Sequence, residues 1–531
     1  MSKKLLCLFL ATAMVLSAMV GCGNKTEPAA SGTASGAAST AESPKSQEND
    51  TLVYAQGADP RGLDPALIDD GESSKVVTNL YEGLVQYKKD STELEPCLAT
   101  SWDVSKDGLS YTFHLRKDVK FHDGTDFNAD AVKFNYDRQL KGKATEDMSY
   151  ASFVFGPVKN VVVVDDHTVT INLSQANTPF LANLAMTQAA PIVSPKALKD
   201  NNNNVNQAPC GTGPYKFVRW DKDQDVVLVR NDNYWGEKAK IKNVIFKIIK
   251  DNSARVIALN NGEADIIDGV DPTVVKQIEG AGNKVQIDKA MMTNYMAYNT
   301  TSKIFKDAKA RRAISAAINV PEMVNTLYQG YDEAATSILP TNLPGYDKSI
   351  QQVAYDPTAA QAALKGLGIT SVHILTYSNA RPYNTVNGQT LAEAIQGYLS
   401  KVGVSCVIDA YDWATFKTKA KAGDYDIIFA GWGGDNGDPD NFLNLLASDD
   451  ASMNYAHYKS SAYNDLIAKG LITPVGTDRN AIYTQCEKIA AEDAAWLPIS
   501  HANFICGVRS NISGFYYHIA YSTKFAGITK S

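Results

Sequence analysis

Residues suited to bind a charged ligand are concentrated in one stretch, residues 425–442, which reads YDIIFAGWGGDNGDPDNF. Its apolar run Ile427–Ala430 predicts a short buried strand. Glycine lets a backbone take positive φ and approach a ligand closely, and four glycines follow the run: Gly431, Gly433, Gly434 and Gly437. Among them lie an indole and three carboxylates: Trp432, Asp435, Asp438 and Asp440. Acidic side chains on a glycine loop suit a site that receives a cation, although a solvated turn has the same composition.

A calcium site does not fit the spacing of these carboxylates. An EF-hand loop has ligands at alternate positions, Gly at the sixth and Glu at the twelfth. Counted from Asp435, the fifth position is Pro439 and the sixth is Asp440. The histidines elsewhere are scattered, and none pairs with another at metal-ligand spacing. We therefore predict neither a metal site nor a cofactor.

The three aspartates differ in their expected roles. Asp435 directly follows two glycines at the end of the predicted strand, where its side chain can reach into a cleft. Asp438 precedes Pro439, which favours an extended conformation. Asp440 is placed to cap a helix over residues 442–446. Asp435 is therefore the predicted cation-binding residue.

The first residues have the pattern of an export signal. Lys3-Lys4 precedes an apolar run, Leu5–Val20, which is too short for a spanning helix and ends in Gly21-Cys22. This ending resembles the lipobox of bacterial lipoproteins, in which the signal is cut before a cysteine that becomes lipidated. A plain secretory signal with an incidental cysteine is the alternative.

These features predict a lipoprotein signal peptide at residues 1–21 and a lipid anchor on Cys22. Residues 22–50 are rich in Ala, Ser, Thr and Gly and have no hydrophobic period, which predicts a disordered tether. The protein is expected on the outer face of the cell membrane, held there by the anchor.

Charge and cysteine content exclude several functions. The chain has 51 basic and 58 acidic residues and no basic stripe, which argues against nucleic acid binding. Beyond Val20 no apolar stretch is long enough to cross a bilayer. The remaining cysteines are odd in number and lack Cys-x-x-Cys spacing, which leaves one disulfide or free buried thiols open; they are Cys97, Cys210, Cys406, Cys486 and Cys506.

Local patterns predict several elements. Period-two alternation around the turn at 106–108 predicts a hairpin within residues 98–121, and a second hairpin is expected from residues 160–164 and 168–173. A strand is predicted at 51–54, a helix at 73–81, and another helix from Asn128, its N-cap, to about residue 140.

Several segments together resemble one protein family. Residues 94–116 read LEPCLATSWDVSKDGLSYTFHLR, residues 120–127 KFHDGTDF and residues 210–217 CGTGPYKF. They are followed by NDNYWG at 231–236 and GEADI at 262–266. From Thr51 to its end the chain resembles the solute-binding proteins of peptide and nickel ABC importers.

Within that family the chain is most similar to the dipeptide-binding proteins, on the segments Arg381-Pro-Tyr-Asn384 and 434–442, GDNGDPDNF. The resemblance implies that Arg381 holds the peptide's carboxylate and Asp435 its ammonium. It implies that the lining of the site includes Tyr383, Trp432, Gly431 and Gly433. A guanidinium matches a carboxylate bidentately, and a carboxylate suits an ammonium.

The resemblance also implies an α/β fold of the two-lobed periplasmic-binding-protein type, with an extra subdomain and a hinge between the lobes. The expected large lobe comprises residues 51–290 and a returning segment at 504–531, with the small lobe at 291–503. The chain is expected to cross between lobes near residues 288–297 and 500–505.

The expected function is the capture of short peptides, above all dipeptides, for delivery to the permease subunits of an ABC importer, by a monomer. Alternatives with the same fold are binding of a nickel complex, haem or an oligosaccharide, or a sensor role. An extracellular hydrolase is the rival class, but the chain has no Ser-x-x-Lys, Gly-x-Ser-x-Gly or His-Glu-x-x-His motif, so no catalytic residues are predicted.

Overall fold

A computed structural model describes residues 50–142, 147–450 and 453–531, all within one compact unit, Ser46–Ser531. The predicted signal peptide, the predicted lipidation site Cys22 and residues 22–49 of the predicted tether lie outside the described residues. Among the described helices, none combines the length and the apolar composition needed to span a bilayer.

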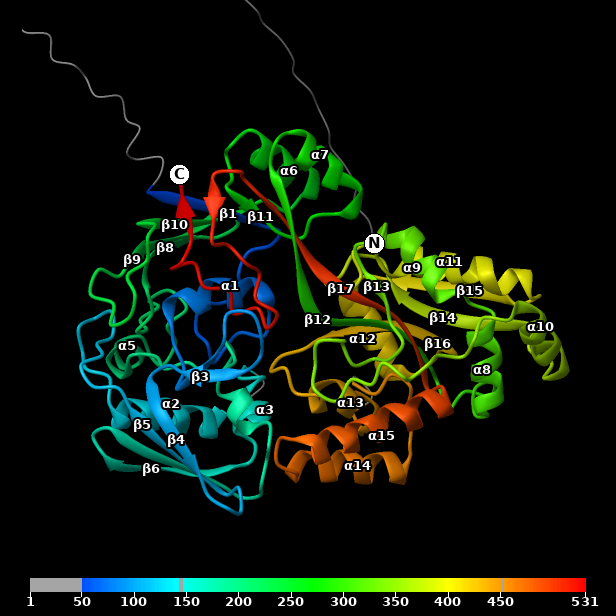
Figure 1. Cartoon of the computed structure of the whole chain (residues 1–531), viewed down its shortest axis with the longest axis horizontal. Helices are drawn as coiled ribbons and strands as arrows, with labels where there is room; N and C mark the ends of the chain where they lie inside the picture. Colours follow the sequence, from blue (N-terminus) through cyan, green and yellow to red (C-terminus); the bar gives the residue numbers. More distant parts are fainter. Residues whose placement is uncertain (1–49, 143–146, 451–452) are drawn as a thin grey trace, which may run out of the picture. The chain divides into compact units, whose positions relative to one another are not determined.

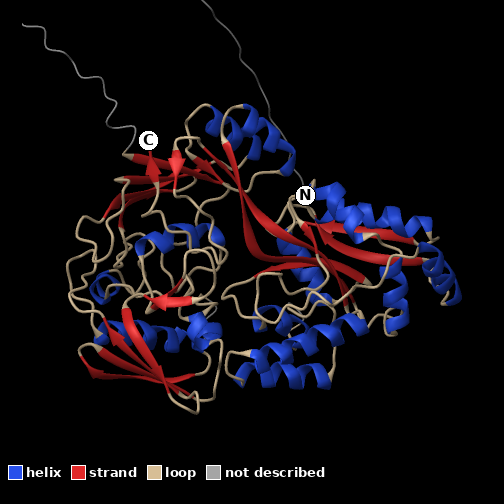
Figure 2. Cartoon of the chain, viewed as in Figure 1, coloured by secondary structure: helices blue, strands red, loops and turns tan. Residues whose placement is uncertain are grey.

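An eleven-stranded mixed sheet is the largest element of the described chain (Figures 1 and 2). Its hydrogen-bonded order is β15-β14-β16-β12-β17-β11-β1-β10-β9-β8, and β13 pairs with β17 beside this path. The strands are β1 (Thr51–Gln56), β8 (Tyr215–Asp221), β9 (Asp225–Arg230), β10 (Asn243–Ile248), β11 (Ile266–Ile267), β12 (Lys284–Tyr298), β13 (Glu333–Ala334), β14 (Ser371–Tyr377), β15 (Ser405–Tyr411), β16 (Ile427–Gly433) and β17 (Trp496–Val508).

Three smaller sheets accompany it. β4 (Ala99–Val104), β5 (Ser110–Leu115), β7 (Thr168–Leu173) and β6 (Val158–Asp165) form an antiparallel sheet in that order. Two pairs stand apart: β2 (Val85–Tyr87) with β3 (Leu94–Pro96), and β18 (Ile512–Ser513) with β19 (Thr529–Lys530). Both predicted hairpins, β4–β5 and β6–β7, are thereby confirmed.

The helices flank these sheets, and α2 lies against the sheet that contains β6 and β7 (Figure 1). In chain order they are α1 (Gly71–Leu80), α2 (Ala129–Gly142), α3 (Ala151–Phe155), α4 (Phe180–Asn183), α5 (Pro195–Asp200), α6 (Asn252–Asn260), α7 (Val275–Gly280), α8 (Ala308–Ala316), α9 (Val320–Tyr328), α10 (Pro357–Gly366), α11 (Gly388–Lys401), α12 (Trp413–Ala422), α13 (Asp440–Ala447), α14 (Ser461–Ile472) and α15 (Thr477–Asp493).

Side-chain caps explain where many helices begin. The Asn128 side chain accepts a hydrogen bond of 3.0 Å from the Ala131 amide, which confirms its predicted role at the start of α2. Asp70 accepts one of 2.9 Å from the Ser73 amide at the start of α1. Each cap satisfies an amide that has no partner within the helix.

Two long antiparallel strands, β12 and β17, connect the two ends of the large sheet (Figure 1). At one end of the pair β17 bonds to β11, and at the other β12 bonds to β16. The pairing of β12 with β17 is interrupted between Lys289 and Thr293 and again between Asn294 and Tyr295. These irregularities fall within the predicted crossing at 288–297.

The core divides into two large apolar clusters and a small one. The first draws mainly on residues 52–266 and 506–528, and the second on residues 290–502. Three half-buried aromatic residues pack against both large clusters: Trp432, Phe504 and Tyr521. The exact lobe boundaries at 290 and 503 stay a prediction.

Candidate functional site

Asp435 follows the end of β16, as the sequence predicts, and both of its carboxylate oxygens have partners. Oδ1 accepts a hydrogen bond of 2.7 Å from the Tyr150 hydroxyl, and Oδ2 one of 3.1 Å from Asn441 Nδ2. Burial raises the pKa of the Asp435 carboxyl, and these two hydrogen bonds oppose the rise. Within the described residues no lysine, arginine or histidine forms an ion pair with Asp435.

Asn441 fixes the geometry of the loop around that carboxylate. Its Oδ1 accepts hydrogen bonds from the Asp435 amide (3.0 Å) and from Trp432 Nε1 (2.9 Å). One side chain thus ties the predicted ammonium-binding residue to the predicted aromatic lining. Asn441 lies inside the loop motif, but nothing in its spacing singled it out.

The glycines of the loop differ from expectation. Of the four, only Gly437 has positive φ (72°). A Cβ on Gly431 would lie 2.2 Å from the Tyr383 ring, and one on Gly434 would lie 2.7 Å from the Phe442 ring. Gly431 and Gly434 are therefore required by close packing of aromatic rings rather than by left-handed backbone.

Asp440 does not cap a helix, so that prediction is wrong. It is the first residue of α13, whose N-cap position is Pro439 without a side-chain cap bond. The Asp440 amide instead donates 2.9 Å to Asp438 Oδ1, and Asp438 is held bidentately by buried Arg479 at 2.7 and 2.8 Å. Asp440 Oδ1 is buried and has no hydrogen-bond partner among the described residues, and burial raises the pKa of the Asp440 carboxyl to about 7.

Arg381 lies in a tight turn that is anchored to the core. Its amide and carbonyl exchange hydrogen bonds with Asn384 at 3.0 and 2.8 Å. The Asn384 side chain is buried, accepts 2.8 Å from the Tyr328 hydroxyl and donates 3.0 Å to the Tyr377 hydroxyl. These hydrogen bonds fix the backbone of the turn to the core. They do not involve the Arg381 side chain, whose position depends on other contacts.

The Arg381 guanidinium stacks on the Trp413 ring, 4.0 Å from its centroid. Its Nε is buried without a hydrogen-bond partner, and no aspartate or glutamate of the described chain pairs with it. Tyr383 lies beside it, buried, with its ring against Gly431. Burial raises the pKa of Tyr383, and the charge of Arg381 opposes that rise.

The two predicted charged residues act on one common neighbour, Tyr521. Burial raises the pKa of the Tyr521 hydroxyl, the charge of Asp435 raises it further, and the charge of Arg381 opposes the rise. The hydroxyl lies 3.0 Å from the position that a Cβ on Gly433 would occupy. The strand that leads into the Asp435 loop therefore packs against Tyr521 at Gly433 and against Tyr383, from the turn that carries Arg381, at Gly431.

Four residues of the site were missed in the sequence: Tyr150, Trp413, Asn441 and Tyr521. Tyr150 and Tyr521 come from segments far from the loop in sequence, and neither belongs to a recognisable motif. Trp413 is the first residue of α12, beyond the predicted segment 381–384. A single sequence carries no signal for such distant contacts.

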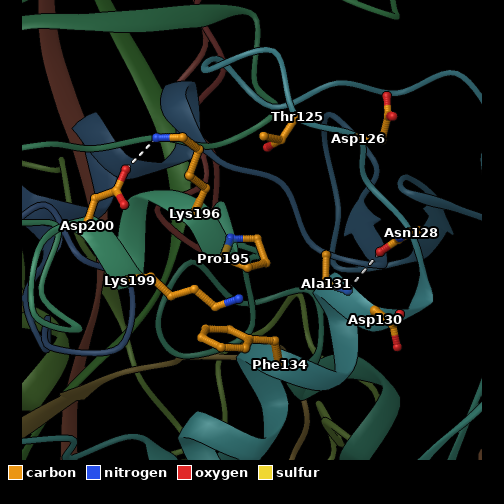
Figure 3. A pocket seen from close by; sticks show the side chains of 10 residues that line it. All are labelled: Thr125, Asp126, Asn128, Asp130, Ala131, Phe134, Pro195, Lys196, Lys199 and Asp200. Carbon is orange, nitrogen blue, oxygen red and sulfur yellow. Dashed lines mark hydrogen bonds and ion pairs between the residues drawn. The ribbon is translucent and has the colours of Figure 1, made fainter.

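A separate hollow of about 410 Å³ lies between the starts of α2 and α5 (Figure 3). Its lining includes Asn128, Phe134, Pro195 and Lys199, none of them a predicted site residue. Figure 3 shows Lys196 paired with Asp200 at its edge, and Lys199 Nζ lies 5.3 Å from the centre of the Phe134 ring. The hollow lacks a buried charge in need of a partner. The loop around Asp435 has one and is therefore the better candidate for a ligand site.

The part of the chain that the structure describes contains no group of three or more His, Cys, Asp or Glu residues placed to hold a metal. The five cysteines at 97, 210, 406, 486 and 506 are all free thiols, four of them buried. Burial raises the pKa of Cys97, Cys210 and Cys486 to about 12, so these thiols stay protonated.

Comparison with known families identifies the fold and the class of protein. Residues 93–454 match the family described as bacterial extracellular solute-binding proteins, family 5 Middle. The chain belongs to this family. Members of family 5 are extracytoplasmic solute-binding proteins and not enzymes, in agreement with the prediction that the chain has no catalytic residues.

Individual relatives cover nearly the whole chain of this family 5 protein. It is 33% identical to the dipeptide-binding protein of Escherichia coli (strain K12), over 88% of this chain and 92% of the relative. It is 32% identical to heme-binding protein A of Haemophilus influenzae, over 89% and 90% of the two chains.

A solved structure agrees with the expected fold. The ABC transporter-associated periplasmic binding protein DppA from Helicobacter pylori, in complex with peptide STSA, is 33% identical and matches with a TM-score of 0.78. The match covers 92% of this chain and 100% of that one. The expectation of a two-lobed α/β fold of the periplasmic-binding-protein type is thereby confirmed for this family 5 protein.

Proposed function

We propose that the protein binds short peptides with free termini, above all dipeptides, in a cleft between its two lobes. Asp435 holds the ligand's ammonium, and Arg381 holds its carboxylate. The observation that carries this proposal is the pair of charged side chains, one of each sign, that lack a counter-ion within residues 50–142, 147–450 and 453–531.

The argument rests on the cost of burying charge. A partly buried carboxylate or guanidinium is stable only when it is hydrogen-bonded and its charge is compensated. Asp435 has neutral hydrogen-bond partners but no cationic partner in the described part of the chain. Arg381 has an aromatic face beneath it, but none of the residues that the structure describes supplies it with an anion. A free dipeptide supplies both missing charges on one small molecule.

The proposed lining consists of Tyr383, Trp432, Gly431 and Gly433. Trp432 packs against both large apolar clusters, a position suited to the floor of a cleft between them. Gly431 admits the Tyr383 ring, and Gly433 admits the Tyr521 hydroxyl. These residues offer apolar surface for ligand side chains between the two charged ends, which is the usual composition of a small-ligand site.

The lobes are proposed as residues 51–290 with 504–531, and residues 291–503. Contacts between the two sets of residues near the site include Tyr150 with Asp435 and Asn183 with Asn436 (2.6 Å between Oδ1 and Nδ2). The Thr178 amide also donates 2.8 Å to the Leu471 carbonyl. We infer that these contacts form on closure about β12 and β17, a hinge motion.

Delivery and anchoring complete the proposal. The protein is a monomer that passes its ligand to the permease subunits of an ABC importer, tethered by lipidated Cys22 to the outer face of the cell membrane. Cys22→Ala should release a soluble protein that still binds ligand, because the tether contributes nothing to the site. Membrane fractionation tests this, and unchanged membrane retention of the variant would contradict it.

Mass spectrometry of the ligand released from purified protein by mild unfolding tests the peptide proposal directly. The expected result is a mixture of short peptides with free termini. A haem, a nickel complex or an oligosaccharide in stoichiometric amount, without peptide, would overturn it.

A further inference from the structure

We propose that Tyr521 is a specificity-determining residue: its ring separates the ammonium-binding carboxylate Asp435 from a second acidic residue, Glu72, and so excludes large cationic side chains from the first residue of the ligand. The proposal rests on the peptide-binding function proposed above and adds a substrate preference to it.

Tyr521 spans the gap between two elements. Its hydroxyl lies 3.0 Å from the Cβ position of Gly433, near the end of β16. Its ring carbon Cδ1 lies 3.2 Å from the Cβ position of Gly71, the first residue of α1. Both neighbours are glycines, so a side chain at either position would displace the ring. The ring therefore occupies the space between the start of α1 and the loop that carries Asp435.

The backbone at Tyr521 supports a specific role for its side chain. Its φ is 59°, a left-handed conformation that is costly for a bulky residue and that glycine adopts freely. The ring is held edge-on by Phe504 (centroids 5.4 Å apart) and Tyr517 (6.4 Å). Strained conformations of this kind persist where the surrounding structure enforces them, often at ligand sites.

Glu72 and Lys75 of α1, the helix that begins at Gly71, belong to a cluster with more acidic than basic groups. Buried Lys75 pairs with both Asp268 and Glu72, the latter at 2.6 Å, so two carboxylates share one ammonium. The Lys75 side chain is 3% exposed and that of Asp268 is 9% exposed, whereas Glu72 is 30% exposed. Glu72 is therefore the most accessible residue of the cluster, although its Oε2, which pairs with Lys75, is itself buried.

Electrostatics connect this cluster to Tyr521. Besides Asp435 and Arg381, the charges of Lys75 and Glu72 also act on the pKa of the Tyr521 hydroxyl. Burial raises the pKa of Glu72 to about 7 even though Lys75 opposes the rise. A ligand cation that reached Glu72 would stabilise its charged form.

Removal of the ring should therefore extend the cleft toward an acidic group. Tyr521→Gly suits the left-handed backbone and keeps the amide that donates 2.9 Å to the His518 carbonyl, so the fold is expected to persist. Tyr521→Phe keeps the ring and is the matched control.

The experiment measures the affinities of Ala-Ala, norleucyl-Ala and Lys-Ala for the wild-type protein, Tyr521→Gly, Tyr521→Phe and the double variant Tyr521→Gly, Glu72→Gln by calorimetry. We expect wild type and Tyr521→Phe to prefer Ala-Ala. Tyr521→Gly should raise the affinity of Lys-Ala relative to Ala-Ala by about tenfold or more, the range expected for one added charge-assisted hydrogen bond. The double variant should lose the advantage of Lys-Ala over norleucyl-Ala.

Three outcomes overturn the inference in distinguishable ways. If the wild-type protein binds Ala-Ala and Tyr521→Gly leaves the Lys-Ala to Ala-Ala ratio within about twofold of wild type, Tyr521 does not set this preference and the peptide function stands. If Tyr521→Gly favours Lys-Ala and norleucyl-Ala equally, the acidic subsite is wrong. If the wild-type protein binds none of the three dipeptides, the proposed function fails and this inference fails with it.

Discussion

The Tyr150 hydroxyl donates a 2.7 Å hydrogen bond to Asp435 Oδ1, a residue 285 positions later in the chain. This bond orients the proposed ammonium-binding carboxylate and stabilises its charged form. It also joins the two proposed lobes beside the proposed ammonium-binding residue, so we expect ligand binding and closure to be coupled through this bond.

Tyr150→Phe should weaken dipeptide binding by about 0.5–1.5 kcal/mol, the net contribution of one hydrogen bond. It should also change the pH dependence of binding. The ammonium requires ionised Asp435, so affinity is lost as the pH falls through the pKa of that carboxyl. Burial raises that pKa and the Tyr150 hydrogen bond lowers it. Without the hydroxyl, the loss should begin at a higher pH.

Calorimetric titrations over a pH series check this expectation. Tyr463→Phe is a matched control, because it removes a buried tyrosine hydrogen bond (2.8 Å to the Leu443 carbonyl) that does not involve Asp435. An unchanged pH profile for Tyr150→Phe would show that the bond does not tune the site.

Arg381→Ala should weaken a free dipeptide by about 2–5 kcal/mol, the cost of truncating one partner of a buried charge pair. A dipeptide with an amidated carboxyl end should bind both proteins equally, because it has no carboxylate for the guanidinium to hold. Arg116→Ala serves as a control, since Arg116 also stacks on a tryptophan, Trp235, at 4.4 Å. Equal losses for the free and the amidated dipeptide would remove Arg381 from the site.

Substitution by asparagine should change the free energy of unfolding in opposite directions at two neighbouring aspartates, Asp440 and Asp438. Asp440 has a folded pKa of about 7, above the unfolded value of about 3.9. Burial of the ionised Asp440 carboxylate therefore destabilises the fold. This cost is absent below the unfolded pKa and reaches its full size above the folded pKa. Asp440→Asn should raise the free energy of unfolding by about 1–3 kcal/mol at pH 8 and leave it unchanged at pH 3.5.

Asp438→Asn should instead lower the free energy of unfolding by about 3–5 kcal/mol, because it breaks the buried ion pair with Arg479. Denaturant melts of both variants at pH 3.5 and pH 8 separate the two effects. A loss of stability in Asp440→Asn at pH 8 would show that its carboxylate is needed as a structural partner.

Local patterns predicted the elements whose determinants lie close together in sequence. The hairpins and the Asn128 cap were predicted because alternation and capping act over a few residues. The Asp440 cap was wrong because Asp438, two residues earlier, makes the local turn and is itself fixed by Arg479, 41 residues away. No short-range pattern contains that contact.

The site likewise combines residues that could be predicted from local sequence segments with residues that depend on distant contacts. The resemblance of two segments to dipeptide-binding proteins predicted Arg381 and Asp435 as the charged site residues, and the charges of both act on the pKa of Tyr521. The contribution of Tyr521 could not be predicted, because its φ of 59° and its contacts with Gly71 and Gly433 arise only from the tertiary fold. The reason for Gly431 was likewise misjudged, since it depends on the Tyr383 ring.

Titration of a free dipeptide into Asp435→Asn tests the central claim most directly. Asn keeps the size of the side chain and removes its charge. Its Oδ1 can still accept from Asn441, and its Nδ2 can donate to the Tyr150 hydroxyl oxygen, so the thermal melt without ligand should stay close to that of wild type. The account predicts that dipeptide binding weakens by about 2–5 kcal/mol, while an N-acetylated dipeptide binds both proteins equally weakly. Binding of the free dipeptide with wild-type affinity would contradict it, because the ammonium would then be held elsewhere.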